Sequence, residues 1–387
     1  MSRKRPHLRY QYEPLDIEHF SEPASEKGAK MEGVTNPDVL RCWEAFHSMG
    51  LQEALRWTDL HQKESSGSTY VIYTDKAADL EAYKPLEPEF IFNKRSLNTI
   101  HYLDDLLCKT NEALVGGGYF LCHAMTSTLQ REITLHSNPP VLGRIKCAHT
   151  YLWHRVFPKI PGFKKLYYAV TNGQNRSFHR VEILGRISRA GFRVVDEEFV
   201  HGEFFVLGQK VRQPLTDDPP KCGPVIKLRR IGKGGEIIGV YKFRTMYSYS
   251  EYLQDYMYLH GGLQKGGKFS DDCRVNFWGK WMRPLWVDEL PMLLNWFKGQ
   301  IKFVGVRPLS QQYFNLYTPE MQELRIKVKP GLIPPFYYEI QSPKTVEEVQ
   351  ASERKYIEAY LEHPFRTDWK YFWRTINNIL FKHKRSH

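Results

Sequence analysis

The chain has 387 residues, which is more than one hydrophobic core usually organises and therefore predicts two domains. Its formal net charge of +12 favours anionic partners such as phosphates, nucleotides or an acidic membrane surface. No apolar run reaches the ~18 residues of a membrane-spanning helix, so such a helix is not expected. Six scattered cysteines without CxxC pairing, and an N-terminus without a secretory signal, predict reduced thiols in the cytoplasm.

The first part of the chain alternates strand and helix patterns. Residues 1–35 are polar, charged and proline-containing, which predicts a loosely ordered arm, and residues 36–66 have a helical pattern. The apolar segment 69–73 predicts a buried strand, and the segment 90–125 predicts strand, helix, glycine-rich turn and strand. This alternation is typical of an α/β layered domain with parallel strands, which we place at residues 36–212.

The end of this domain predicts a helix near residues 179–190 and an antiparallel hairpin that turns at His201-Gly202. Over residues 90–212 the order of elements resembles the second half of a class I methyltransferase-like fold, which implies a degenerate Rossmann-like domain. The cofactor loop of such folds follows a strand, whereas Gly116–Gly118 follow a helix and indicate a helix stop. We therefore expect no cofactor site here, and methyltransferase activity stays an alternative hypothesis.

Residues 133–181 form an insertion in this domain that contains no Asp or Glu. Aromatic residues are interleaved there with eight cations: Arg144, Lys146, Arg155, Lys159, Lys164, Lys165, Arg176 and Arg180. Rings and cations without acids suit the headgroup region of an anionic bilayer, which predicts membrane contact by the insertion. The alternative is a basic surface whose rings belong to the core. No recognised nucleic-acid-binding motif accompanies the cations, so nucleic acid is not an expected partner.

After a turn-rich break at residues 219–224, the character of the chain changes. Two strand patterns flank Gly232–Gly235 and predict a hairpin that carries many cations. Five cations in this half are candidates for neutralising the charge of phosphate oxygens: Lys242, Arg244, Arg283, Arg307 and Arg325. Each of them alone is equally typical of a surface or ion-pair residue.

Two adjacent carboxylates, Asp288 and Glu289, directly precede Leu290-Pro291 and an apolar run. Proline is tolerated only in the first turn of a helix, so both carboxylates are expected at a helix N-terminus. Backbone N–H groups there favour an ionised carboxylate and also an incoming phosphate. One carboxylate at such a place can attack phosphorus, and a second can hold Mg²⁺ together with phosphate oxygens. The alternative is a purely structural helix cap.

Further short motifs follow one another in a fixed order through residues 222–387. In chain order they are Gly223-Pro224, Arg230-Ile231-Gly232, Lys242–Met246, Asp272-x-Arg274, Gly279, Arg283, Asp288-Glu289-Leu290-Pro291, Asn295, Lys298-Gly299, Val304-Gly305, Arg307-Pro308 and Lys329-Pro330-Gly331. This series resembles the bacterial sugar transferase family, the monotopic polyprenyl-phosphate phosphoglycosyl transferases. The resemblance covers some two-fifths of the chain and implies a mixed α+β, mainly helical module at residues 222–387.

The resemblance implies a ping-pong reaction that starts exopolysaccharide, capsule or glycoconjugate synthesis. Asp288 would attack the sugar-bearing phosphate of a UDP-sugar and expel UMP, and polyprenyl phosphate would then accept the phosphosugar. Glu289 would carry Mg²⁺, and Arg283 and Arg307 would grip phosphates. The expected location is peripheral, on the cytoplasmic face of the cell membrane. A catalytically silent assembly factor of a glycan pathway is the alternative hypothesis.

The chain departs from the family in one way that bears on its lipid substrate. The family normally places a hydrophobic re-entrant helix just before the Gly-Pro block, where this chain has a predicted hairpin and a hydrophilic linker. Membrane contact is then expected from residues 144–168 or from a C-terminal helix. The apolar residues of that helix are Trp369, Phe372, Trp373, Ile376, Ile379 and Leu380. Packing of this helix onto the module is the alternative.

Overall fold

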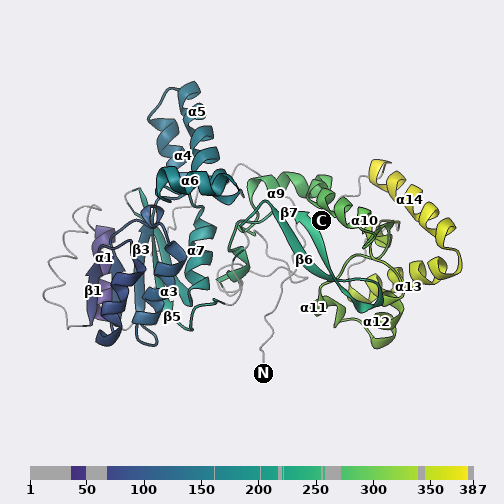
Figure 1. The fold of residues 1–387 in the computed structure, drawn as a ribbon, viewed down its shortest axis with the longest axis horizontal. Helices are drawn as coiled ribbons and strands as arrows, with labels where there is room; N and C mark the ends of the chain where they lie inside the picture. Colours follow the sequence, from purple (N-terminus) through teal and green to yellow (C-terminus); the bar gives the residue numbers. More distant parts are fainter. Residues whose placement is uncertain are drawn as a thin grey trace. The chain divides into compact units, whose positions relative to one another are not determined.

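The computed structural model describes residues 36–48, 68–160, 162–200, 202–216, 220, 222–253, 256–257, 272–338 and 345–381. These residues form two compact units (Figure 1). Among the described residues, the N-terminal unit contains those from Asn36 to Gly223 and those of Tyr247–Arg274, and the C-terminal unit contains Pro224–Met246 and those from Val275 onward. The predicted arm at 1–35 and the helical pattern beyond Ser48 lie outside the described residues.

A five-stranded sheet forms the centre of the N-terminal unit, in the order β1-β2-β3-β5-β4. Strands β1, β2 and β3 are parallel, and β5 is antiparallel to both of its neighbours. The strands are β1 (Thr69–Ile72), β2 (Phe90–Asn93), β3 (Tyr119–Ala124), β4 (Phe192–Val200) and β5 (Glu203–Lys210). The predicted parallel strands and the predicted closing hairpin are therefore confirmed.

The sheet is covered on both faces because its strands are apolar on both. Phe90 and Phe92 pack with α1 (Pro37–Ser48) on one face, while Ile91 between them joins the core on the other face. This alternation follows from the two-residue period of a strand. The second core contains residues of α3 (Leu103–Ala113) and α7 (Arg180–Arg189). A layered α/β unit is thus confirmed, and the closer likeness to a methyltransferase-like fold stays a prediction.

The insertion at 133–181 is helical in the described residues. Helices α4 and α5 form a hairpin that projects from the sheet, and α6 lies at its base (Figure 1). The remaining helices of the unit are η2 (Ala77–Leu86), η3 (Leu97–Thr99), α4 (Ser127–His136), α5 (Pro140–Thr150), the π-helix η4 (Tyr151–Val156), η5 (Phe157–Lys159), α6 (Phe163–Thr171) and η7 (Ser250–Tyr252).

The segment Tyr247–Arg274 packs with the N-terminal unit, although its place in the chain predicts that it belongs to the C-terminal module. The reason is a set of long-range contacts. The Tyr249 hydroxyl donates to Asp104 at the start of α3, and a Cβ on Gly185 of α7 would lie 2.4 Å from the Tyr249 carbonyl oxygen. The α7 backbone therefore lies directly against this segment, where no side chain would fit. The rest of the aromatic helical pattern predicted near 250–260 lies mostly outside the described residues.

The C-terminal unit contains the predicted cationic hairpin and a second small sheet. Strands β6 (Val225–Ile231) and β7 (Ile237–Phe243) are antiparallel, and their turn has Gly234 and Gly235 at φ 69° and 80°, which favours glycine. Strands β8 (Lys302–Val304) and β9 (Gly331–Ile333) pair in parallel. A Cβ on Gly331 would lie 2.2 Å from the Gly305 nitrogen, so two of the family motifs meet at this pair because neither carries a side chain there.

Helices surround these strands and supply most of the core. They are α9 (Phe277–Met282), η8 (Arg283–Leu285), η9 (Val287–Met292), α10 (Leu293–Phe297), α11 (Gln311–Phe314), α12 (Pro319–Ile326), η10 (Pro335–Tyr338), α13 (Val346–Glu362) and α14 (Pro364–Phe381). The largest cluster of the unit joins residues from β8 to α14, with Tyr356 and Ile357 of α13 fully buried at its centre. Among the described helices of the whole chain, none is both long and apolar enough to cross a membrane.

Candidate active site

Asp288 and Glu289 lie in the first turn of η9, a short 3₁₀ helix that runs directly into α10. Their side chains are 13% and 18% exposed. Trp286, just before this helix, adopts the left-handed conformation with φ 55°, and its carbonyl accepts from the Glu289 N–H. Such a conformation is costly for a bulky residue and is found preferentially at functional sites. The carboxylates therefore stand at the start of a helix, as the position of Pro291 predicts.

Lys242 reaches both carboxylates from the end of β7. Its Nζ donates to Glu289 Oε1 over 2.5 Å and lies 3.9 Å from Asp288 Oδ2. Burial raises the pKa of Asp288, and the neighbouring charge of Glu289 raises it further, whereas the cations Lys242 and Arg283 lower it. The lysine therefore favours the ionised form of Asp288, which is the form that can act as a nucleophile.

Asn295 holds α10 against β7 and thereby fixes the carboxylates relative to Lys242. Its side chain is fully buried, accepts from the Tyr241 N–H over 2.9 Å, and donates to the Gly239 carbonyl over 2.7 Å. It also donates to Gln300 over 2.8 Å. Tyr241 directly precedes Lys242, so the same strand segment carries the lysine and is tied to the helix.

Arg283 is held by Thr245, which lies close after β7. Its Nε and one terminal nitrogen donate to Thr245 Oγ1 over 2.9 and 2.5 Å. The close approach depends on Gly279 of α9, since a Cβ there would lie 2.2 Å from the Thr245 carbonyl oxygen. Thr245 was not predicted as a site residue, and its only signal in the sequence is its place in the block Lys242–Met246.

Arg307 lies beside Arg230 of β6. Burial first and the positive charge of Arg307 second lower the pKa of Arg230 to about 10, so the two cations are near enough to interact. No carboxylate partner of either side chain is found in the described part of the chain. Two neighbouring cations without a paired carboxylate are typical of an anion-binding site. Arg230 is therefore a candidate that the sequence placed in a motif but not in the site.

The structure does not support a substrate-binding role for Arg325. Its guanidinium is 4% exposed, pairs with Glu353 of α13 and donates to the carbonyl oxygen of Arg307. A cation already neutralised by a buried carboxylate is not available to a phosphate. Arg325 instead holds the loop that carries Arg307. Arg244 follows β7 directly, and its backbone N–H donates to Pro224 over 2.7 Å.

Apolar side chains stand beside the carboxylates. Leu290, Leu294 and Phe297 are exposed along η9 and α10, at positions that share one helix face. From α10, aromatic rings contact one another in a continuous row that crosses β8 and follows α14. In order, the row contains Phe297, Trp296, Phe303, Phe372, Trp373, Trp369 and Phe365.

The α14 face predicted for membrane contact is divided between packing and solvent. Phe372 packs against the core, whereas Trp369 and Trp373 are exposed. The structure does not describe the side chains of Ile379 and Leu380.

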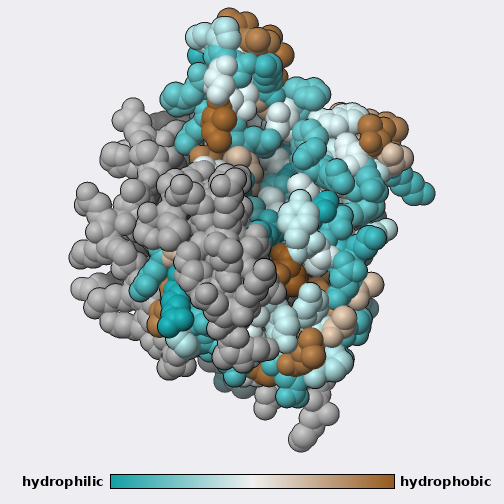
Figure 2. Space-filling view, turned by 90° about the vertical axis from the view of Figure 1, so that its left-hand side faces the viewer, coloured by the Kyte–Doolittle hydropathy of each residue, from teal (hydrophilic) through white to brown (hydrophobic). Residues whose placement is uncertain are grey.

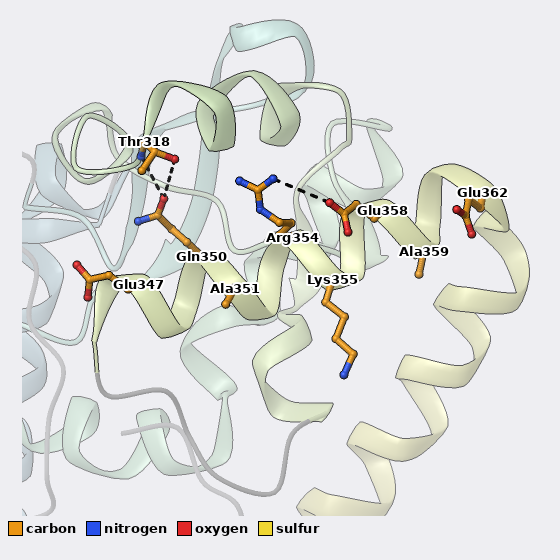
Figure 3. Close-up of a pocket in the computed structure, with 9 residues that line it drawn as sticks. All are labelled: Thr318, Glu347, Gln350, Ala351, Arg354, Lys355, Glu358, Ala359 and Glu362. Carbon is orange, nitrogen blue, oxygen red and sulfur yellow. Dashed lines mark hydrogen bonds and ion pairs between the residues drawn. The ribbon is translucent and has the colours of Figure 1, made fainter.

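A hollow of about 640 Å³ lies along α13, well apart in the chain from the residues above. Its lining is polar, and Figure 3 shows Gln350 turned toward Thr318 and Arg354 toward Glu358. None of the predicted site residues lines it. The concavity is therefore not where the predicted chemistry is located.

The carboxylates were also predicted to hold Mg²⁺. Two adjacent carboxylates are a fitting donor set, because Mg²⁺ prefers one or two carboxylates completed by phosphate oxygens and water. Over the described residues no cluster of three or more His, Cys, Asp or Glu side chains occurs. A site built only from protein ligands is thus not found there, while a site completed by substrate fits Asp288 and Glu289.

Residues 218–382 match the sequence model of a family described as "Bacterial sugar transferase". The C-terminal region belongs to that family. The match includes both carboxylates and the predicted cations Lys242, Arg244, Arg283 and Arg307. The N-terminal unit, apart from its last residues and the segment Tyr247–Arg274, lies outside the match.

Three relatives illustrate the sugar transferase region. An "Uncharacterized sugar transferase EpsL" of Bacillus subtilis is 40% identical over 114 residues, which are 29% of this chain and 50% of the relative. The "Exopolysaccharide production protein ExoY" of Sinorhizobium fredii is 34% identical over 109 residues, 27% of this chain and 48% of the relative. A "UDP-N-acetylgalactosamine-undecaprenyl-phosphate N-acetylgalactosaminephosphotransferase" of Aeromonas hydrophila is 34% identical over 115 residues, 28% of this chain and 24% of the relative. The chain thus spans half or less of each relative.

Proposed function

We propose that the chain transfers a sugar phosphate from a UDP-sugar to a polyprenyl phosphate, with Asp288 as the nucleophile. One arrangement carries the proposal: two adjacent carboxylates share the ammonium group of Lys242 and stand beside exposed apolar side chains of the same helices. An ionised carboxylate suits attack on phosphorus, and an apolar border suits a lipid phosphate. The name of the Aeromonas relative supports a UDP-sugar donor and an undecaprenyl phosphate acceptor. The name of the Sinorhizobium relative supports a role in exopolysaccharide production.

In the first half-reaction, an Asp288 oxygen attacks the sugar-bearing phosphorus of the UDP-sugar. A bond forms between that oxygen and phosphorus, the bond from phosphorus to the bridging oxygen breaks, and UMP leaves with the electron pair. Asp288 must be ionised for this step, and Lys242 favours that state. Arg283, held by Thr245, and the pair Arg230 and Arg307 neutralise the charge of the phosphate oxygens.

In the second half-reaction, a phosphate oxygen of the polyprenyl phosphate attacks the same phosphorus. The bond to Asp288 breaks, the carboxylate is restored, and the product is a polyprenyl diphosphate sugar. Leu290, Leu294 and Phe297 offer an apolar surface to the lipid beside the reacting group. The exposed rings Trp369 and Trp373 of α14 extend that surface and suit contact with the interface of a bilayer.

Glu289, with the phosphate oxygens of the donor, would hold Mg²⁺. The ion would neutralise negative charge on the phosphates. Glu289 accepts a hydrogen bond from Lys242, so the lysine and a metal ion compete for the same carboxylate. Weak metal binding in the absence of donor follows from this competition.

The test is a UMP-release screen across UDP-sugars with full-length protein, Mg²⁺ and polyprenyl phosphate. One UDP-sugar is expected to yield UMP with the wild type, and Asp288→Asn is expected to abolish release. Radiolabelled UMP should exchange into the donor without acceptor, because the first half-reaction is complete in itself. Equal turnover by Asp288→Asn would refute the assignment of the nucleophile. Failure of the wild type to bind any uridine nucleotide would instead favour a silent assembly protein.

A further inference from the structure

The α4–α5 hairpin of the N-terminal unit has no core of its own. In the chain it follows β3 and precedes the π-helix η4, and it projects away from the sheet (Figure 1). The two helices approach closely at Gly143, where a Cβ would lie 3.4 Å from Leu135 Cα. No side chain of α4 is buried, and Gly143 is the only buried residue of α5. The remaining side chains of both helices are thus at least partly open to their surroundings.

Exposed apolar side chains line α5, from the tip of this hairpin toward its base. Val141 and Ile145, one turn apart on α5, are 72% and 61% exposed, and Leu142 and Leu152 are exposed as well. Positions 141 and 145 share one face of α5, since side chains four residues apart on an α-helix lie above one another, and Leu152 follows in the π-helix η4. Figure 2 shows hydrophobic residues collected at the upper end of the molecule, where Figure 1 places this hairpin.

A second exposed apolar face follows on α6. Phe163, Leu166 and Val170 are all exposed and stand three and seven residues apart from the first of them, again on one helix face. Exposed apolar patches of this size mark a surface that another phase or molecule covers. We call residues 141, 142 and 145 the apolar tip, and the exposed face of α6 lies at the base of the same hairpin.

The eight cations of the insertion fall into two groups, four that bond within the unit and four that are exposed. Four are used inside the unit: Lys159 and Arg180 pair with Glu182 and Glu197, while Arg155 and Arg176 donate to backbone carbonyl groups. The other four are exposed: Arg144 and Lys146 on α5 with the apolar tip, and Lys164 and Lys165 on α6 beside its exposed apolar face. No acidic residue occurs from 133 to 181 to neutralise them.

We propose that the α4–α5 hairpin, with α6, inserts its apolar tip into an anionic lipid bilayer. Apolar side chains that enter the acyl region, flanked by cations that meet the headgroups, are the physical requirements of an interfacial membrane element. Each cation near an anionic surface strengthens binding about fivefold, so four of them favour anionic over neutral lipid by a large factor. A protein partner would need a surface that is both apolar and strongly acidic, which makes lipid the better match.

This element lies in the unit outside the sugar transferase region. It gives the chain a contact with the membrane that does not depend on the sugar-phosphate chemistry, so the two proposals fail separately. Binding of Asp288→Asn to anionic vesicles is accordingly expected to equal that of the wild type.

The experiment is flotation of the full-length protein with vesicles of phosphatidylcholine, with or without phosphatidylglycerol. The wild type is expected to float with the anionic vesicles and to dissociate as salt is raised. The triple variant Val141→Glu/Leu142→Glu/Ile145→Glu should bind at least about tenfold more weakly, because it places acids where apolar groups enter the lipid. Arg144→Glu/Lys164→Glu should lose binding only to the anionic vesicles. All five positions are exposed, so folding is expected to be retained and circular dichroism verifies it.

The control is Leu86→Glu, another exposed apolar residue of the same unit that lies outside the insertion, which should bind like the wild type. Vesicle binding of the triple variant within twofold of the wild type would overturn the proposal, whatever the UMP-release result. So would a wild type that ignores vesicles but forms dimers that the triple variant dissociates, because the apolar tip would then be a self-association surface.

Discussion

The side chain of Lys242 on β7 donates a 2.5 Å hydrogen bond to Glu289 on η9, and so joins the cationic hairpin to the turn that carries the proposed nucleophile. The two residues are 47 positions apart in the chain. Their contact brings an ammonium group to the edge of the carboxylate pair, next to Asp288, whose pKa is raised by burial. The hairpin is therefore part of the site, because it supplies the charge that the helix start lacks.

Lys242→Met is expected to reduce UMP release about 100-fold, the typical effect of removing one electrostatic partner from an active site. It should also move the acid limb of the pH profile to higher pH. Lys242 lowers the pKa of Asp288, so its loss raises that pKa, and the carboxylate then becomes ionised only at higher pH. The measurement is UMP release as a function of pH.

Lys227→Met on the neighbouring strand is the control, since that lysine is exposed and does not pair with either carboxylate in the described structure. An unchanged acid limb in Lys242→Met would contradict the role of the lysine.

Thr245→Val should weaken donor use because it removes the acceptor of both Arg283 hydrogen bonds. We expect an increase of about tenfold in KM for the UDP-sugar, in keeping with about 1.5 kcal/mol, the lower end of the range for a hydrogen bond to a charged group. Thr245→Ser keeps the oxygen and should restore the wild-type KM. A serine variant that is as impaired as the valine variant would indicate a packing role for the threonine methyl group instead.

Asn295→Leu should destabilise the C-terminal unit by about 2–3 kcal/mol, because it leaves the Tyr241 N–H and the Gly239 carbonyl buried without their partner. Urea unfolding followed by circular dichroism measures the loss. Gln300→Ala removes only one hydrogen bond of the same asparagine and should cost less than about 1 kcal/mol. Equal losses in the two variants would show that the asparagine does not hold α10 to β7.

The strands and the place of the carboxylates were predictable because their signals are local. Apolar runs bounded by turns predict β1, β2 and β3, and Pro291 fixes the helix start near Asp288. The contact of Tyr249 with Asp104 is not local, so the packing of Tyr247–Arg274 with the N-terminal unit was not foreseen.

Long-range pairing also explains why the predicted substrate-binding role of Arg325 lacks support in the structure. The sequence alone does not distinguish Arg283 from Arg325, because both are arginines of the same basic module. Only the fold reveals that Arg325 meets Glu353, 28 residues away, whereas Arg283 meets the hydroxyl of Thr245. The strained conformation of Trp286 likewise has no signal in the sequence, because tryptophan rarely adopts a positive φ.

Arg325→Met and Glu353→Leu are each expected to lower the unfolding free energy by about 3–5 kcal/mol, because each leaves the other member of a buried ion pair without its partner. Arg325→Met also leaves the Arg307 carbonyl without its donor. Arg307→Met should behave differently, with near wild-type stability and a raised KM for the donor. Urea unfolding and donor titration of the three variants separate the two patterns. A donor defect in Arg325→Met without any loss of stability would restore Arg325 to the substrate site.

Arg230→Gln should stabilise the free protein and weaken its binding of phosphate-containing ligands. The pKa of Arg230 is lowered to about 10 by burial and by Arg307, so the charged form is disfavoured in the folded state. That penalty is present at neutral pH and fades only as the pH rises through 10, because the arginine loses its proton there more readily when folded. Replacing the charge should therefore raise the melting temperature at pH 7.

An anion that binds between Arg230 and Arg307 neutralises both charges, so UMP or inorganic phosphate should raise the melting temperature of the wild type. The increase should be much smaller for Arg230→Gln, because one half of the anion site is missing. Arg229→Gln is the matched control, since Arg229 is the adjacent, exposed arginine on the opposite face of β6. If the ligand raised the melting temperature of Arg230→Gln as much as that of Arg229→Gln, the anion would bind elsewhere. Arg230 would then have no role in anion binding.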